Sequence, residues 1–381
     1  MNNNHQLLNI GKKLYLYSFG IGMFLIIFST SKFKVTNNLT DNASVISLFI
    51  AIILFFISIF YTNYFTYSEI VFIIVVLTIG TVTSFISKGS EPFMMSLYMI
   101  SSRKINPYDV LKVVFIVNVA LFLSNYILFR AGILLDYQNF SINKHSFGYN
   151  HPNQMGISIF SLISISMVFL YTKRTSKSLI NYLILFLQVP LLVLVFLSGS
   201  RGAEIATIIT YIIFCILILT HESKKNLLII SVSVLVICLL FSLYTVGNSV
   251  NTVGSFLYTL NQLFTQRLQL NNYFYNNYGV SLFGQRVTYN LNASLSSNYA
   301  IIDNAYIKLI INYGISYTIF YLTYIFYLVK KVILKNEFAL LIPIISFIGY
   351  GVVEQGFIQY WVNFSMLFGG IFFVLGVEEN E

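Results

Sequence analysis

The stretch from 227 to 245 reads LLIISVSVLVICLLFSLYT, nineteen residues without a charged side chain. A helix needs about 20 predominantly apolar residues to cross a hydrocarbon core about 30 Å thick, so this stretch predicts a membrane-spanning helix. Eleven further runs of the same kind lie on either side of it. The twelve predicted helices cover approximately residues 14–30, 44–61, 70–87, 91–102, 110–129, 155–172, 179–197, 202–220, 227–245, 309–329, 338–353 and 363–377.

The composition of the chain points the same way. Of its 381 residues, 57% are hydrophobic and 9% are charged, against about 45–50% and about 25% in soluble domains. This excludes a disordered or collagen-like chain, and the only two cysteines, Cys215 and Cys238, lie in apolar runs rather than in a disulfide framework. We therefore predict an all-α polytopic protein of the cell membrane. The first run has no small-residue cleavage site and predicts a retained helix rather than a signal peptide.

The distribution of cations predicts an orientation. With the N-terminus in the cytoplasm, 13 of the 22 Lys and Arg residues lie inside and 9 outside, as the positive-inside rule expects. The rule accounts for just over half of the cations behind the net charge of +9, so no nucleic-acid partner is expected. Both termini then face the cytoplasm, and we predict a single membrane domain over residues 1–381.

Two segments depart from the apolar pattern, and both fall on the predicted outer face. They are a first outer loop at 130–154 and a large outer loop at 246–302. The second contains Asn271–Tyr278, NNYFYNNY, which has the polar and aromatic character of a carbohydrate-binding surface. An ordinary solvated loop is an equally acceptable interpretation.

Charged side chains are scarce in mid-membrane, which weakens a proton-coupled transporter. Cations retained outside, against the insertion bias, suggest an anionic ligand such as a phosphate or diphosphate. An ordinary surface loop would also carry some of them. The outer polar set comprises Arg130, Lys144, His145, His151, Arg201, Glu204, Arg267, Arg286, Asp303, Lys308 and Glu354.

The first motif is KHSFGYNHPNQMG at 144–156. Pro152 is suited to the first turn of a helix, which places Asn150 and His151 at a helix N-terminus, where free backbone N–H groups favour anions. This predicts a phosphate or sugar clamp. A capped interfacial helix with a polar entry turn is the alternative.

The second motif is LSGSRGAE at 197–204. Ser200 is a candidate N-cap, and Arg201 and Glu204 are neighbours on one helix face. A guanidinium held by the carboxylate would present its donors to a phosphate. A snorkelling Arg with a local salt bridge explains the same residues.

Two further motifs follow the large outer loop. DNAYIK at 303–308 leads into Asn312–Ile315, and EQGF begins at Glu354. Asp303 or Glu354 is a candidate general base if its surroundings raise its pKa.

Taken in order, these pieces resemble the Wzy-type polysaccharide polymerases of the O-antigen polymerase and ligase superfamily. The resemblance rests on GYNHPN at 148–153, SGSRGA at 198–203, DNAY at 303–306 before Gly314 and Ile315, and the late Glu354, together with the layout of helices and outer loops. Related chains often carry an Arg shortly before the first Gly, where this chain has Lys144. The ammonium group of Lys144 is a point charge, whereas an Arg guanidinium can donate two parallel hydrogen bonds to one anion.

The resemblance implies a glycosyltransferase that polymerises lipid-linked repeat units for capsule, exopolysaccharide or O-antigen. A growing glycan on undecaprenyl diphosphate would be transferred to a hydroxyl of an incoming lipid-linked unit on the outer face. No cofactor and no metal are implied, and a flippase and a chain-length regulator are the protein partners it suggests.

Roles are assigned on the same basis. Arg201, helped by Arg286 and Lys144, would hold the diphosphate, and His145, Asn153 and Tyr306 complete the binding set. His151, Asp303 or Glu354 would orient or deprotonate the acceptor hydroxyl. Three alternatives remain at this point. The first is a ligase that transfers finished glycan, and the second is a flippase or exporter of lipid-linked oligosaccharide, which should line a central cavity with cations. The third is a purely structural membrane scaffold, which would leave the outer polar clusters unexplained.

Overall fold

The computed structural model describes residues 2–34, 43–60, 65–136, 144–174, 179–220, 223–247, 253–264, 266–289 and 301–372. Across these residues every regular element is a helix, and the chain adds one isolated bridge between Phe33 and Leu134. The all-α prediction is therefore confirmed for the described residues.

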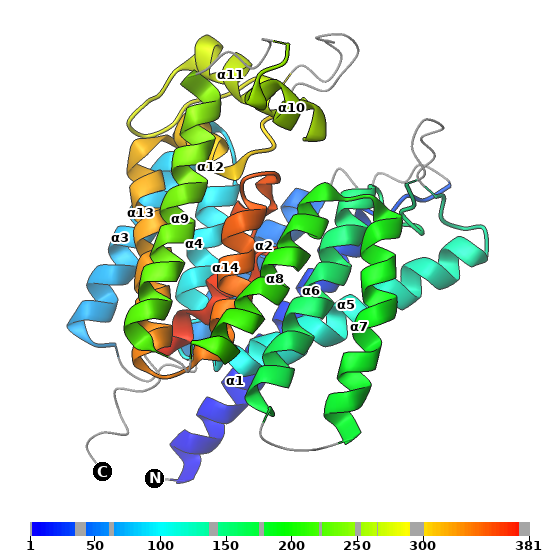
Figure 1. Cartoon of the computed structure of the whole chain (residues 1–381). Helices are drawn as coiled ribbons and strands as arrows, with labels where there is room; N and C mark the ends of the chain where they lie inside the picture. Colours follow the sequence, from blue (N-terminus) through cyan, green and yellow to red (C-terminus); the bar gives the residue numbers. More distant parts are fainter. Residues whose placement is uncertain are drawn as a thin grey trace.

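The helices follow the predicted apolar runs (Figure 1). The first half contains α1 (Asn2–Ser29), α2 (Ala43–Phe60), α3 (Tyr67–Ser87), α4 (Glu91–Ser101), α5 (Pro107–Arg130), α6 (Pro152–Thr172) and α7 (Leu179–Ser198). The second half contains α8 (Arg201–Leu219), α9 (Lys224–Gly247), α10 (Phe256–Leu263), α11 (Arg267–Tyr278), α12 (Ala305–Lys308), α13 (Gly314–Leu334) and α14 (Leu341–Tyr350). A π-helical turn, Leu309–Tyr313, joins α12 to α13, and 3-10 turns cover Phe338–Leu340, Gln355–Ile358 and Phe364–Phe372.

Eight helices among the described residues are long and apolar enough to cross a membrane, which supports a multi-pass membrane protein. The other four predicted runs form shorter elements: α2, the 11-residue α4, α14 and the 3-10 turn at 364–372. Every residue of α14 is buried, as are Phe364–Ile371. A count of apolar residues cannot separate a segment enclosed by other helices from one that spans, so the number of crossings stays a prediction.

The exposed surface of the bundle is apolar. In the hydrophobic windows of α3, α7 and α9, only 22%, 11% and 22% of the residues are buried inside the protein. Large side chains such as Phe186 and Phe196 on α7 are exposed. Such surface is far more than a soluble monomer displays, and lipid covers it naturally.

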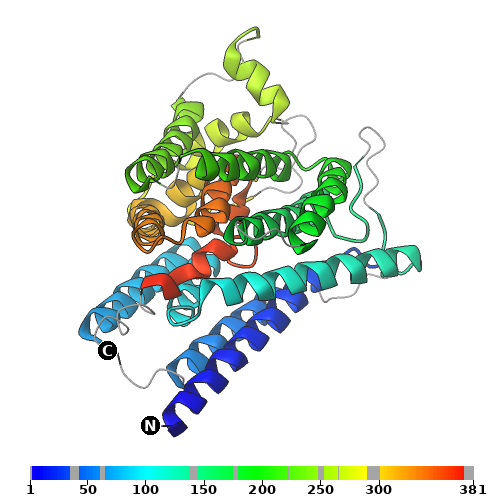
Figure 2. The same cartoon turned by 60° about the horizontal axis from the view of Figure 1, so that its bottom comes forward.

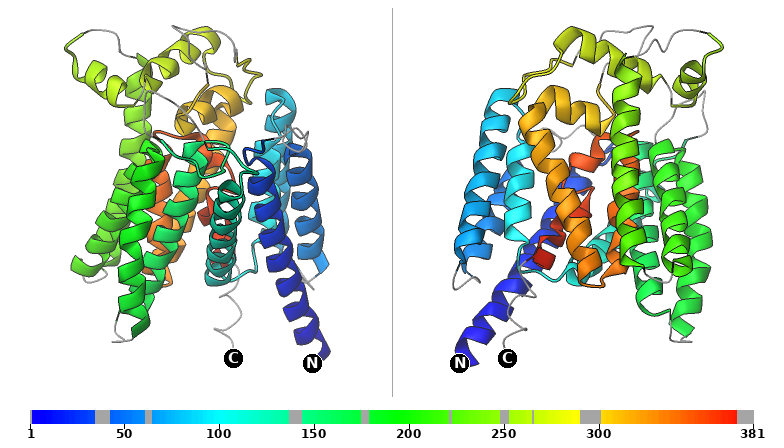
Figure 3. Two further views of the ribbon diagram at one scale, coloured as in Figure 1. Left: turned by 90° about the vertical axis from the view of Figure 1, so that its right-hand side faces the viewer. Right: turned by 60° about the vertical axis from the view of Figure 1, so that its left-hand side comes forward.

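At the centre lies α6, 89% buried in its hydrophobic window, and it contacts α5, α7, α8 and α14. The turn at 364–372 packs between α5 and α13 (Figure 2). Helices α10 and α11 cover one end of the bundle, and the N-terminal end of α1 lies at the opposite end (Figure 3). We call the first the α11 end.

Candidate functional site

The first motif folds into a helix start, as predicted. His151 is the N-cap of α6, and its Nδ1 accepts a hydrogen bond of 3.1 Å from the backbone N–H of Asn153, while Pro152 occupies the first turn. Because Nδ1 is the acceptor, the neutral imidazole carries its proton on Nε2. His151 is therefore set up at Nε2 to donate a hydrogen bond rather than to remove a proton.

The carboxylate of Asp136 binds three residues that precede α6, His145, Ser146 and Phe147. Oδ1 of Asp136 accepts hydrogen bonds from the backbone N–H groups of Ser146 and Phe147, at 2.6 and 3.1 Å, and Oδ2 lies 2.8 Å from Nδ1 of His145. The His145 ring also stacks on Phe147, with 5.5 Å between the ring centroids. His145 thus contributes to the loop rather than to the charge cluster described below.

The second motif packs against the first. Ser200 caps α8 by accepting from the N–H of Ala203, which confirms its predicted role. Gly199 has a φ of +57°, and a Cβ built there would lie 2.9 Å from Cγ of Lys144. The alkyl chain of Lys144 therefore lies over this turn, next to the start of α8.

Arg267, the first residue of α11, joins the remaining motifs. Its Nε lies 3.1 Å from Oδ2 of Asp303, and its Nη1 donates to Oε1 of Glu354 and to the carbonyl oxygen of Val353, both at 2.6 Å. Its side chain is 19% exposed. The two carboxylates predicted as candidate bases both bind this one guanidinium.

Glu354 also connects α6 and α8. Oε1 of Glu354 accepts a second hydrogen bond of 2.6 Å, from Nδ2 of Asn153. A Cβ built at Gly202 would lie 2.5 Å from Cγ of Glu354. The absence of a side chain at Gly202 leaves the space that the Glu354 stem occupies.

We call Lys144, His151, Asn153, Arg201, Arg267, Asp303 and Glu354 the charge cluster. Arg201 donates from Nη1 to the carbonyl oxygen of Gln262 at 3.2 Å, and its charge acts on Lys144. No ion pair within 4.0 Å joins the described side chains of Arg201 and Glu204, so the predicted carboxylate clamp on Arg201 is not present.

The electrostatics of the cluster combine three cations, Lys144, Arg201 and Arg267, with two carboxylates. Burial lowers the pKa of Lys144, and the positive charges of Arg201 and Arg267 lower it further. Partial desolvation of the ring lowers the pKa of His151 to about 4, with further contributions from Lys144, Arg267 and Lys32. His151 is therefore neutral at pH 7.

The carboxylates respond in the opposite direction. Burial raises the pKa of Glu354, the Arg267 guanidinium opposes that rise, and the nearby Asp303 carboxylate adds to it. Burial likewise raises the pKa of Asp303 against the opposing charges of Arg267 and Lys308. Both carboxyl groups hold a proton more readily than ordinary surface carboxylates.

Two predicted binding residues lie elsewhere. Tyr306 is fully buried, donates from its hydroxyl to the carbonyl oxygen of Ile348 at 2.8 Å, and packs on Phe357. Its side chain packs in the core, away from the charge cluster, and its role in substrate binding stays a prediction. Arg286 is exposed, and no described ion pair links it to the charge cluster.

The NNYFYNNY stretch belongs to α11 rather than to a loop. Asn271 and Phe274 are buried, whereas Tyr273, Tyr275, Asn276 and Asn277 are exposed. The exposed amides and tyrosine rings stay a predicted carbohydrate-binding or solvated surface.

Arg267 is the site residue that sequence reasoning left out. Arg267 belongs to the predicted outer cations, but no motif around it distinguishes it from the other cations of that set. Its two carboxylate partners lie 36 and 87 residues away in the chain, so no neighbouring residue signals these ion pairs. Among the described residues, no three His, Cys, Asp or Glu side chains gather in a way that could hold a metal ion.

Comparisons with protein-family models, with curated proteins and with solved structures found no match for this chain.

Proposed function

We propose that this protein is a membrane polymerase of lipid-linked oligosaccharide repeat units, acting at the α11 end of the bundle. The observation that carries the proposal is the convergence of three cations, Lys144, Arg201 and Arg267, from three segments far apart in sequence. The charges of Arg201 and Arg267 act unfavourably on Lys144, the carboxylates of Glu204 and Glu354 offset part of this repulsion, and a bound anion would relieve the rest. A diphosphate, with several oxygens for guanidinium and ammonium donors, fits such a group.

The roles follow from the contacts. Arg267, Lys144 and Arg201 would hold the diphosphate of the donor lipid, and His151 would add a hydrogen bond from Nε2. An acceptor hydroxyl oxygen attacks the anomeric carbon of the donor glycan. The bond from that carbon to the phosphate oxygen breaks, and undecaprenyl diphosphate leaves with the electron pair. The positive charges stabilise the negative charge that develops on this leaving group.

Glu354 is the proton acceptor that we propose. A diphosphate that binds Arg267 competes with Glu354 for the same Nη1–H, since that donor bonds Oε1 of Glu354 in the structure. Once released, a buried carboxylate with a raised pKa accepts the proton of the attacking hydroxyl more readily than an ordinary one. Asp303 would keep Arg267 in place through Nε during this exchange.

Deletion of the gene tests the proposal. We expect single repeat units on undecaprenyl diphosphate to accumulate at the outer leaflet, with loss of long polymer, as measured by mass spectrometry of extracted lipids and by gel analysis of surface glycan. Repeat units trapped on the cytoplasmic side would indicate a flippase instead. Full-length glycan left on its lipid would indicate a ligase.

A further inference from the structure

Helix α10 has apolar side chains on two sides. On the side that packs against the bundle, Leu257 forms a buried cluster with Leu268 of α11, and Phe241 of α9 packs against that cluster. Phe256 and Leu263 are seven residues apart and therefore lie on one face of the helix. Their side chains are 72% and 56% exposed. This second apolar face thus points away from the protein.

The pattern is typical of a helix that lies in a membrane surface. Such a helix buries its apolar face about 5–10 Å into the boundary between headgroups and acyl chains and turns its polar face to water. Gln262, which is exposed, lies about 120° around the helix from Phe256. The sequence of α10, FLYTLNQL, contains no carboxylate that would repel phosphate headgroups. Removal of each large apolar side chain from water contributes roughly 1.5–3 kcal/mol.

The C-terminal end of α10 lies at the level where α8 leaves the hydrocarbon core. α8 has 19 residues, so its length is about 28 Å at roughly 1.5 Å per residue. This length is close to the hydrocarbon thickness of about 30 Å. Arg201 is the first residue of α8, and its Nη1 donates to the carbonyl oxygen of Gln262 at 3.2 Å. That hydrogen bond holds α10 at one boundary of the hydrocarbon core.

The exposed apolar surfaces of α8 and α9 lead up to α10. On α8, Ile208 and Ile212 are exposed and lie on the same helix face as Arg201. On α9, Tyr244 is exposed near the end of the helix, a position typical of the aromatic belt at a membrane interface. Figure 1 shows α10 beyond the ends of both helices, which it meets through Arg201 and Phe241. Its exposed apolar face therefore continues a surface that lipid covers.

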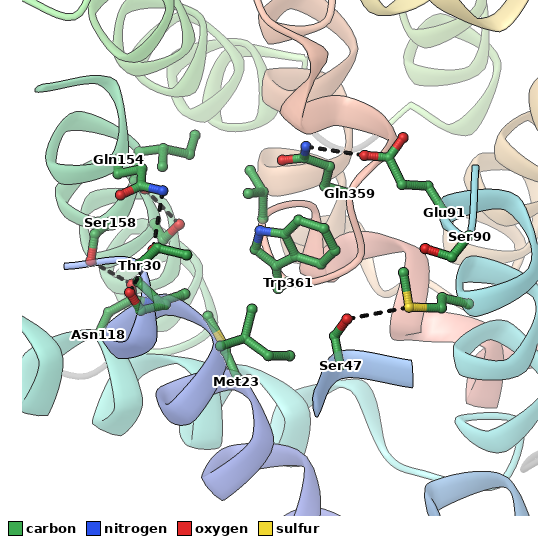
Figure 4. A pocket seen from close by; sticks show the side chains of 16 residues that line it. Met23, Thr30, Ser47, Ser90, Glu91, Asn118, Gln154, Ser158, Gln359 and Trp361 are labelled. Carbon is green, nitrogen blue, oxygen red and sulfur yellow. Dashed lines mark hydrogen bonds between the residues drawn. The ribbon is translucent and has the colours of Figure 1, made fainter. Parts of the chain in front are cut away.

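Apolar side chains inside the bundle have a different setting. A cavity of about 380 Å³ lies between α1, α2, α4, α5 and α6, with apolar walls formed mainly by Met and Ile side chains (Figure 4). Glu91 is the one ionisable side chain among the described residues that line it, and Nζ of Lys308 binds Oε2 of Glu91 at 2.8 Å. Lys and Arg, with which a flippase should line a central cavity, are absent from its described walls. The surrounding helices shield this cavity, whereas Phe256 and Leu263 face outward.

We propose that α10 is an interfacial helix, with Phe256 and Leu263 embedded in the phospholipid bilayer at the boundary between headgroups and acyl chains. Through the carbonyl oxygen of Gln262, this attachment would also fix the guanidinium of Arg201 at the membrane surface. The consequence for diphosphate binding rests on the proposed function. The contact between α10 and the bilayer does not.

The test uses tryptophan fluorescence of the full-length protein in phosphatidylcholine liposomes. Trp361 is the only native tryptophan, so the wild type supplies the background emission. We expect the added emission of Phe256→Trp and of Leu263→Trp to be quenched by phosphatidylcholine brominated near the glycerol end of its acyl chains. Bromine near the chain terminus should quench it less, and aqueous acrylamide should quench it little.

Gln262→Trp is the matched control, because this position lies on the polar side of the same helix. Its added emission should be quenched by acrylamide and little by brominated lipid. The proposal would be overturned if Phe256→Trp and Leu263→Trp were as open to acrylamide, and as insensitive to brominated lipid, as Gln262→Trp. Two separate positions on the apolar face guard against a local distortion by either substitution.

A second measurement separates this inference from the proposed function. If the protein is a polymerase, the double variant Phe256→Ser, Leu263→Ser should form less polymer than the wild type at the same protein level. Lipid quenching at both positions, in a protein whose gene deletion leaves polymer unchanged, would uphold the interfacial helix and reject the polymerase. Polymer formation without lipid quenching would reject the interfacial helix alone.

Discussion

Nη1 of Arg267 and Oε1 of Glu354 lie 2.6 Å apart although 87 residues separate them in the chain. Asn153 binds the same carboxylate oxygen, so one contact point joins α6, α11 and the segment after α14. A diphosphate can accept hydrogen bonds from the guanidinium of Arg267. Glu354 would then lose its hydrogen bond from Nη1 of Arg267. This pair links the stability of the α11 end to its proposed chemistry.

Removal of Arg201 should affect activity more than stability. Among the described residues its guanidinium makes one hydrogen bond, to the carbonyl oxygen of Gln262, worth on the order of 1 kcal/mol. We expect Arg201→Ala to abolish polymer formation at an unchanged protein level, measured by glycan gel and by immunoblot of the membrane fraction. Arg130→Ala, at an exposed cation at the end of α5, is the control and should make normal polymer. Normal polymer length in Arg201→Ala would remove Arg201 from the site.

Removal of Arg267 should destabilise the protein because it leaves two partly buried carboxylates without their cation. Removing one partner of a buried ion pair costs about 3 kcal/mol or more. Replacing every charged partner by a neutral side chain costs far less. We expect Arg267→Ala to melt at a lower temperature than wild type in detergent. The triple variant Arg267→Met, Asp303→Asn, Glu354→Gln should recover most of that loss. A triple variant no more stable than Arg267→Ala would argue against the charge arrangement.

Gly202 tests the packing beneath Glu354. A methyl group at this position would meet Cγ of Glu354 and the ring of Tyr350, and such overpacking costs about 1–3 kcal/mol. Gly202→Ala should lower both the melting temperature and polymer yield. Gly247→Ala is the matched control, since a Cβ at Gly247 meets nothing within 4 Å. Equal behaviour of the two variants would show that the Glu354 stem has room to move.

His151 predicts a pH dependence of stability. In the unfolded chain its pKa is about 6.5, and in the folded protein it is about 4. Below about pH 6.5 the unfolded state takes up a proton that the folded state resists, so His151 makes the protein less stable as the pH falls toward 4. His151→Asn keeps a good N-cap but removes the titration.

The measurement compares melting temperatures of wild type and His151→Asn between pH 7 and pH 4. We expect the variant to lose less stability over this range. Parallel pH profiles would mean that His151 is protonated as easily in the folded protein as in the unfolded chain.

The sequence predicts a structural feature reliably where neighbouring residues alone determine that feature. The starts of α6 at His151 and Pro152, and of α8 at Ser200, follow from capping chemistry within four residues. The structure also brings residues of all four motifs together, whereas the assignment of these segments to the outer face stays a prediction.

Arg267 and Tyr306 show where sequence reasoning stops. The ion pairs of Arg267 depend on how α11 packs against segments remote in the chain, and no local pattern records that packing. Tyr306 stands in a motif beside the candidate site residue Asp303, but its side chain turns into the core toward Ile348. Burial of a side chain is a property of the packed bundle, and a motif cannot show it.

The most direct test of the central claim is reconstituted polymerisation. The lipid-linked repeat unit isolated from the deletion strain is incubated with purified protein in liposomes, and products are followed by gel and mass spectrometry. The account predicts a ladder of glycans, with one undecaprenyl diphosphate released for each linkage formed, and no ladder with Arg267→Ala or Arg201→Ala. Substrate recovered unchanged, with protein that is folded and binds it, would contradict the account.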